Sequence, residues 1–100
     1  MSRTFYSDYV RHALRFYSRN SLTVPHFKTD VDKENWWSCH KVISQYPVKA
    51  KQMLLSVYSG YDTLPDEVYI ASQKWQTEQN EIWDLMKEIE RKIAHKRGLL

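Results

Sequence analysis

Cys39 and His40 are the residues whose types could form a nucleophilic pair, because a histidine can take the proton from a thiol. The two are adjacent in a stretch with helical spacing, so their side chains point about 100° apart. A histidine that faces away from the thiol cannot activate it. We therefore expect no catalytic residue here.

Metal and phosphate sites are also poorly supported by the sequence. The single cysteine excludes the usual structural zinc sites, which need at least two thiolates. The other histidines are scattered without metal-ligand spacing, at His12, His26 and His95. The only two glycines, Gly60 and Gly98, form no phosphate-binding loop. We expect no enzyme, no bound metal and no cofactor.

Three arginines, Arg11, Arg15 and Arg19, are spaced four apart and share one helix face. This row could be a solvated face that balances a hydrophobic one. It could also contact phosphates or an acidic protein surface. Both interpretations stay open at the level of sequence.

The adjacent tryptophans Trp36 and Trp37 pose a similar choice. Trp36 suits the core, and Trp37 could cover a seam between helices. Alternatively, Trp37 could be an exposed anchor for a partner, since tryptophan is over-represented at binding hot spots. Trp83 raises the same question, and we expect it to be half exposed.

The elements that carry these residues are predicted to be five helices and no strand, in one domain over residues 1–100. Apolar residues recur at helical spacing, and Pro and Gly mark the breaks. The N-terminal part (1–45) holds two helices, one over about Thr4–Arg19 and one capped by Asp30 or Asp32. The C-terminal part (46–100) holds three helices. The first covers about 47–58, with Pro47 in its first turn. The second is opened by Pro65, and the third starts near Thr77 or Gln79. Gly60 is the expected C-cap of the third helix.

The composition suits a soluble intracellular protein, with 42% hydrophobic and 27% charged residues. No apolar run approaches the ~20 residues of a membrane span, and the N-terminus lacks a signal-peptide core. The lone cysteine fits a reducing cytosol. We expect a cytoplasmic protein with no membrane contact.

Residues 46–100 resemble region 4 of bacterial sigma factors and the small sigma-like regulators of phages and integrative elements. The stretch "YPVKAKQMLLSVYSGYDT" is similar to the first helix of that family. The stretch "LPDEVYIASQKWQTEQNEIWDLMKEIERKIAHKR" is similar to its helix-turn-helix and basic tail. Gln76 stands where the family has a turn glycine, and Thr77 where it has a buried valine.

The resemblance implies an all-α fold with a DNA-reading second helix. It places four residues at the major groove, Glu78, Gln79, Asn80 and Trp83. Lys87 and Arg91 would approach phosphates. The implied partners are promoter DNA or RNA polymerase, and the implied role is transcription regulation in a phage or mobile element.

The charge of this helix departs from the family pattern. Residues 77–86 carry Glu78, Glu81 and Asp84 and no basic side chain, whereas residues 87–97 are net +3. DNA affinity depends largely on phosphate neutralisation, so this layout predicts weak binding. The same layout also stabilises any helix through its dipole, with or without DNA.

A second function therefore stays open, in which the helical scaffold binds a protein. The partner could be a host protein or a defence nuclease that the chain inhibits, and Trp37, Trp83 and the arginine row would contact it. We also expect a homodimer through the first helix, because its aromatic face is too broad for a chain of this length to cover. A basic groove beside residues 78–92, built from Arg11, Arg15 or Lys74, would favour DNA. An acidic or apolar surface there would favour a protein partner.

Overall fold

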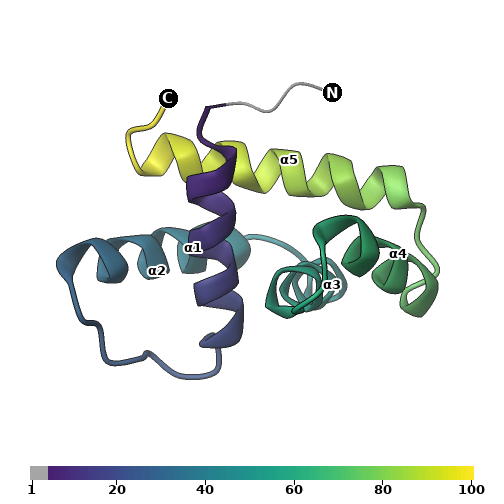
Figure 1. Cartoon of the computed structure of the whole chain (residues 1–100), viewed down its shortest axis with the longest axis horizontal. Helices are drawn as coiled ribbons and strands as arrows, with labels where there is room; N and C mark the ends of the chain where they lie inside the picture. The colour runs from purple at the N-terminus through teal and green to yellow at the C-terminus, as the bar shows by residue number, and fades with distance from the viewer. Residues whose placement is uncertain (1–4) are drawn as a thin grey trace.

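The computed structural model describes residues 5–100 and confirms the all-α fold, with five helices and no strand in that range. The helices are α1 (Ser7–Arg19), α2 (Asp30–Ile43), α3 (Val48–Ser59), α4 (Leu64–Lys74) and α5 (Gln79–Lys96). In Figure 1, α5 runs along the long axis of the molecule, with α3 and α4 beneath its N-terminal half. Its C-terminal half passes over α2 and is crossed by α1.

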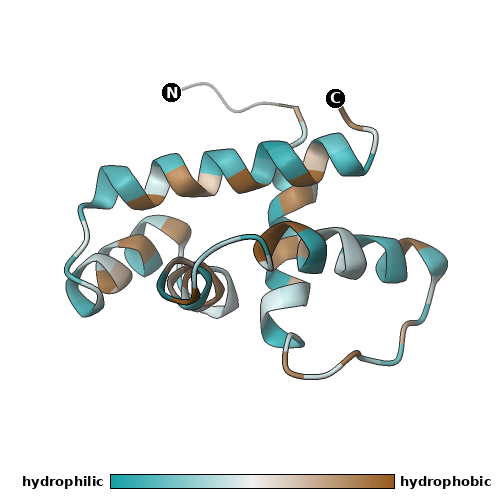
Figure 2. Cartoon of the chain, turned by 180° about the vertical axis from the view of Figure 1, so that it is seen from behind, coloured by the Kyte–Doolittle hydropathy of each residue, from teal (hydrophilic) through white to brown (hydrophobic). Residues whose placement is uncertain are grey.

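The predicted apolar stripe of α5 forms the centre of the core. Ile82, Met86, Ile89 and Ile93 are all buried, and Leu85 is only partly buried. Their three- and four-residue spacing keeps them on one helix face, and Figure 2 shows the hydrophobic residues of α5 gathered toward the other helices. Helices from both halves of the sequence share this single core.

The aromatic face of α1 is mostly covered within the chain. Val10, Leu14 and Tyr17 are at most 1% exposed, because α2, α3 and α5 all pack against this helix. Phe5 and Tyr9 remain exposed near its N-terminal end. The stated reason for a homodimer, an uncovered face, is therefore mostly absent, and dimerisation stays a prediction.

Several helix boundaries differ from the sequence prediction. Thr4, the predicted start of the first helix, lies outside the described residues, and the helix begins at Ser7. The prediction that Asp30 or Asp32 caps α2 was wrong. The cap is Thr29, whose hydroxyl accepts a hydrogen bond from the Asp32 amide at 3.1 Å. Both aspartates lie in the first turn instead, where they favour the helix dipole.

The prolines and Gly60 lie within one residue of their predicted roles. Pro47 is the N-cap of α3 rather than part of its first turn, and Pro65 follows the first residue of α4, which Thr63 caps. Gly60 is the C-cap of α3, with φ −67° and ψ 159°, so it is not left-handed. A Cβ at Gly60 would overlap the Glu67 carboxylate, which is the end of a flexible side chain and would have to move aside.

Among residues 5–100, no helix combines the length and the apolarity that crossing a bilayer requires.

Candidate functional site

The chain bends between α4 and α5 as the helix-turn-helix prediction requires. Trp75 caps α4, and Gln76 adopts φ 50°, in the left-handed region that favours glycine. The Thr77 amide donates a hydrogen bond to the Ser72 carbonyl at 3.0 Å, which closes the turn. A bend that crosses the two helices is expected to bury Trp75 against Ile82 and Leu85. Trp75 is instead only partly buried, with the Lys74 ammonium 4.5 Å from its ring centre.

The solvent face of α5 carries most of the predicted DNA contacts. Asn80, Asp84, Lys87 and Arg91 follow one another along this face, and all are exposed. Within the described chain, none of the four makes a side-chain hydrogen bond or an ion pair. These side chains are therefore free to contact a ligand.

Gln79 and Trp83 lie at the edges of this face. Gln79 is exposed because it is the first residue of the helix, and Trp83 is partly buried against the core. Trp83 is thus less exposed than the half exposure that the sequence predicted. Its indole ring is less available to a ligand than the side chain of Asn80.

Amide side chains surround the turn itself. A shallow polar pocket there is lined by Gln73, Gln76, Gln79 and Asn80, together with Ser72, Thr77, Glu78 and Glu81. An amide both donates and accepts hydrogen bonds, which suits the paired donor and acceptor of an adenine edge. The lining of this pocket therefore offers amide hydrogen-bonding groups and contains no basic side chain.

The arginine row does not supply that missing charge. Arg11 donates to the Glu90 carboxylate at 3.0 Å, and Arg15 donates to the Gly60 carbonyl at 3.4 Å. Arg19 donates to the same carbonyl at 3.0 Å. Contact of this row with phosphates or a partner would require these intramolecular bonds to break. The acidic leading turn of α5 thus receives no basic groove from α1.

Glu90 is the residue that the sequence interpretation missed. It is 3% exposed and also accepts a 2.6 Å hydrogen bond from the Tyr58 hydroxyl. Burial, followed by the Glu90 charge, raises the pKa of Tyr58 well above its usual value. A signal was present, since position 90 lies four residues after Met86 and three before Ile93, on the buried face.

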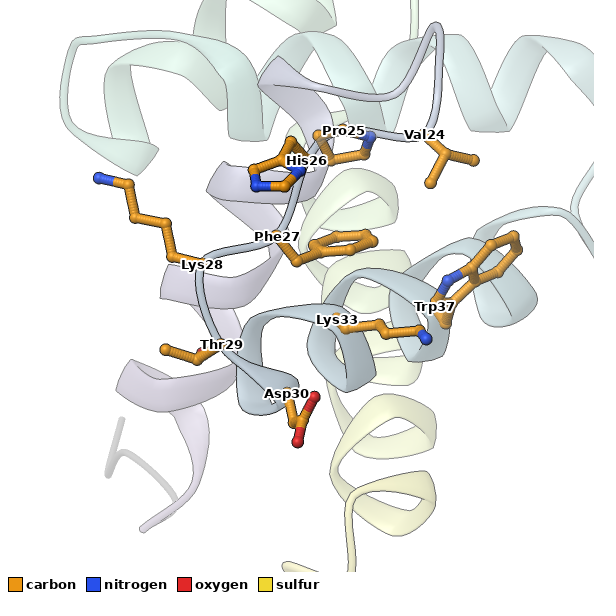
Figure 3. A pocket seen from close by; sticks show the side chains of 9 residues that line it. All are labelled: Val24, Pro25, His26, Phe27, Lys28, Thr29, Asp30, Lys33 and Trp37. Carbon is orange, nitrogen blue, oxygen red and sulfur yellow. The ribbon is translucent and has the colours of Figure 1, made fainter.

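The two adjacent tryptophans differ in burial, as expected if Trp36 belongs to the core and Trp37 covers a seam between helices. Trp36 is 2% exposed, whereas Trp37 is partly buried. The two rings meet edge-on, with their centroids 4.9 Å apart. Figure 3 shows Trp37 beside Lys33 on one side of an open pocket, opposite the loop residues 24–29. Trp37 is reachable from this pocket, so its role as a partner contact stays a prediction.

Cys39 and His40 have separate surroundings. Cys39 is fully buried, and His40 shares a 3.0 Å hydrogen bond between its Nδ1 and the Tyr17 hydroxyl. Burial raises the pKa of the Cys39 thiol from 9.0 to about 12, and the Arg97 charge opposes this only in part. Residues 5–100 contain no group of three or more potential metal-ligating side chains.

We expect Cys39 to resist alkylation in the folded protein. At pH 8 a thiol with a pKa of about 12 exists as thiolate in roughly one molecule in ten thousand, and the thiolate is the nucleophile. Mass spectrometry after iodoacetamide treatment should show little labelling in buffer and complete labelling in urea. Rapid labelling of the folded chain would contradict this burial.

Comparisons with protein-family models, curated proteins and solved structures found no match for this chain.

Proposed function

We propose that this chain is a sigma-like, DNA-binding transcription regulator of a phage or mobile element. The observation that carries the proposal is the bend at Gln76, which presents the amide-rich turn and the free Lys87 and Arg91 on one exposed side of α5. Such a regulator would act in the cytoplasm, on promoter DNA or together with RNA polymerase.

The two halves of α5 would have different tasks. Gln79 and Asn80 would reach base edges, where an amide can pair with adenine. Lys87 and Arg91 lie two to three turns further along and would contact phosphates. With two such contacts, the logarithm of affinity should fall with the logarithm of salt at a slope of about −2. Binding would be weaker than for a fully basic recognition helix.

Asp84 gives the sharpest test, because it lies between Asn80 and Lys87 on the same face. We expect Asp84→Asn to tighten binding about threefold, since a unit charge roughly 7 Å from a phosphate costs about 0.6 kcal/mol in water. Lys87→Ala should weaken binding and reduce the salt slope by about one. Fluorescence anisotropy with a mixed-sequence duplex of about 20 base pairs, from low to physiological salt, measures both effects.

Lys33→Ala is the matched control, because it removes the same charge from an exposed position on α2. It should leave the affinity and the salt slope nearly unchanged. If the folded parent chain binds no duplex at low salt, the DNA-binding proposal is refuted. Equal effects of Lys33→Ala and Lys87→Ala would mean that the attraction is not localised on α5.

The acidic leading turn favours a second candidate, a protein-binding module that takes a basic partner surface. Glu78, Glu81 and Asp84 are exposed and lack ion pairs within the described residues. The partner would be a host or defence protein, captured from a lysate of the encoding cell. Asp84→Asn separates the two candidates. The substitution should weaken binding of a basic protein partner and strengthen binding of DNA.

A further inference from the structure

A groove lies at the other end of α5, away from the helix-turn-helix bend. Phe5 and Tyr6, just before α1, line one part of it, and Val42 of α2 and Gln45, just after that helix, line another. The C-terminal half of α5 completes it, and the groove encloses about 1130 Å³. Figure 1 shows α1 crossing α5 in this region. The groove is large enough for several side chains of a partner.

The apolar part of this groove lacks a cover within the described chain. Phe5 is 81% exposed, and its ring meets Tyr6 edge-on at a centroid distance of 5.6 Å. Leu100 is 54% exposed on the same groove, above the buried Val42. A large aromatic ring left in water beside other apolar groups is typical of a binding surface.

The rim of the groove is positively charged. Lys87, Arg91 and Lys96 border it, and none of them makes an ion pair within residues 5–100. The only side-chain carboxylate in the lining belongs to Glu88, which Lys92 already pairs at 3.4 Å. The unpaired side-chain charge of the groove is therefore basic.

The helix dipole does not explain this row of bases. Cations stabilise a helix C-terminus only within about its last turn. Lys96 is the last residue of α5, but Arg91 and Lys87 lie five and nine residues before it. An anionic ligand beside the apolar groove would complement the charges at these two positions.

We propose that this groove binds an acidic, amphipathic segment of a partner protein. The apolar face of the segment packs on Phe5 and Leu100, and its carboxylates meet Arg91 and Lys96. A helix with apolar anchors three and four residues apart and acids on its flanks has this chemistry. Charge complementarity selects such a segment over a basic or neutral one.

This inference does not depend on DNA binding, although Lys87 and Arg91 border both surfaces. Phe5 separates the two, because it lies in the groove and is remote in sequence and position from the turn at Gln76. Its substitution changes no charge. A variant at Phe5 should therefore alter peptide binding and leave duplex binding unchanged.

The test uses three labelled synthetic peptides with the same apolar residues. The first is a helical peptide with leucines on one face and glutamates on the other. The second has lysine in place of glutamate, and the third has the glutamate sequence scrambled so that no apolar face forms. Fluorescence anisotropy with the full chain should show binding of the first peptide alone, and weakening as salt rises.

Phe5→Ser should weaken binding of the glutamate peptide about tenfold or more, because it removes the central apolar contact. Leu22→Ser is the matched control, since Leu22 is 98% exposed on the loop after α1 and outside the groove. It should leave peptide binding unchanged. Circular dichroism checks that both variants remain folded.

Three results would overturn the inference. The first is equal binding of the glutamate, lysine and scrambled peptides. The second is unchanged binding by Phe5→Ser. The third is a dimer in sedimentation that Phe5→Ser dissociates, which would assign the groove to a second copy of this chain. Duplex binding by the same variants is measured in parallel, so loss of the DNA proposal is recorded separately.

Discussion

Replacing Glu90 by alanine is expected to lower the free energy of unfolding by about 3 kcal/mol, because it breaks a buried charge pair. Glu90 accepts hydrogen bonds from the Arg11 guanidinium at 3.0 Å and from the Tyr58 hydroxyl at 2.6 Å. The Glu90 side chain is 4% exposed and that of Arg11 is 22% exposed. Removal of the carboxylate leaves both donors without their acceptor. Urea denaturation followed by circular dichroism gives the value.

Glu88→Ala is the control for this substitution, on the same helix and with the same change of charge. Glu88 pairs with Lys92 at 3.4 Å, but about half of each side chain is exposed. Exposed pairs of this kind contribute at most about 1 kcal/mol. If the two variants lost equal stability, the buried network around Glu90 would not have the importance assigned to it.

Trp36→Ala is expected to cost about 3–5 kcal/mol, the usual range for removing a large buried aromatic residue. Its ring meets the Tyr17 ring edge-on at a centroid distance of 5.2 Å and stacks on the His40 ring at a centroid distance of 5.1 Å. Its indole N–H donates to the Asn20 carbonyl at 3.1 Å, which ties the loop after α1 to α2. We expect a large fall in the denaturation midpoint and faster proteolysis in residues 20–29.

The matched control is Trp37→Ala, which removes the same side chain one position later. Trp37 is only partly buried, so its loss should cost about 1 kcal/mol, the typical effect of a substitution. Both variants are compared by circular dichroism rather than fluorescence, because each loses a fluorophore. A larger loss for Trp37 than for Trp36 would reverse the assignment of the two rings.

Local sequence patterns were enough to predict most of the fold. The spacing of Ile82, Met86, Ile89 and Ile93 fixed the buried face of α5, and the prolines placed the breaks to within one residue. The predicted N-cap of α2 was wrong, because Asp30 and Asp32 lie one and three residues after the observed cap, Thr29. The side chains of all three residues can accept an amide hydrogen bond. This error arises because neighbouring residues have side chains that can cap the helix equally well.

Contacts between distant segments could not be predicted in this way. Arg11 and Glu90 are 79 residues apart, and nothing local pairs them. The arginine row therefore looked free in the sequence, although the fold uses its members to bond Glu90 and the end of α3. The groove beside Phe5 likewise combines distant segments, since Phe5 and Tyr6 line it together with the C-terminal half of α5.

The central claim, that the exposed side of the α4–α5 bend binds DNA, is tested most directly by an NMR titration. Isotope-labelled protein is mixed with the mixed-sequence duplex at low salt, and amide chemical shifts are followed for residues 5–100. The largest changes should fall on Gln76, Asn80, Lys87 and Arg91. Unchanged shifts at Gln76 and Asn80, or changes confined to groove residues outside α5 such as Phe5 and Gln45, would contradict the account.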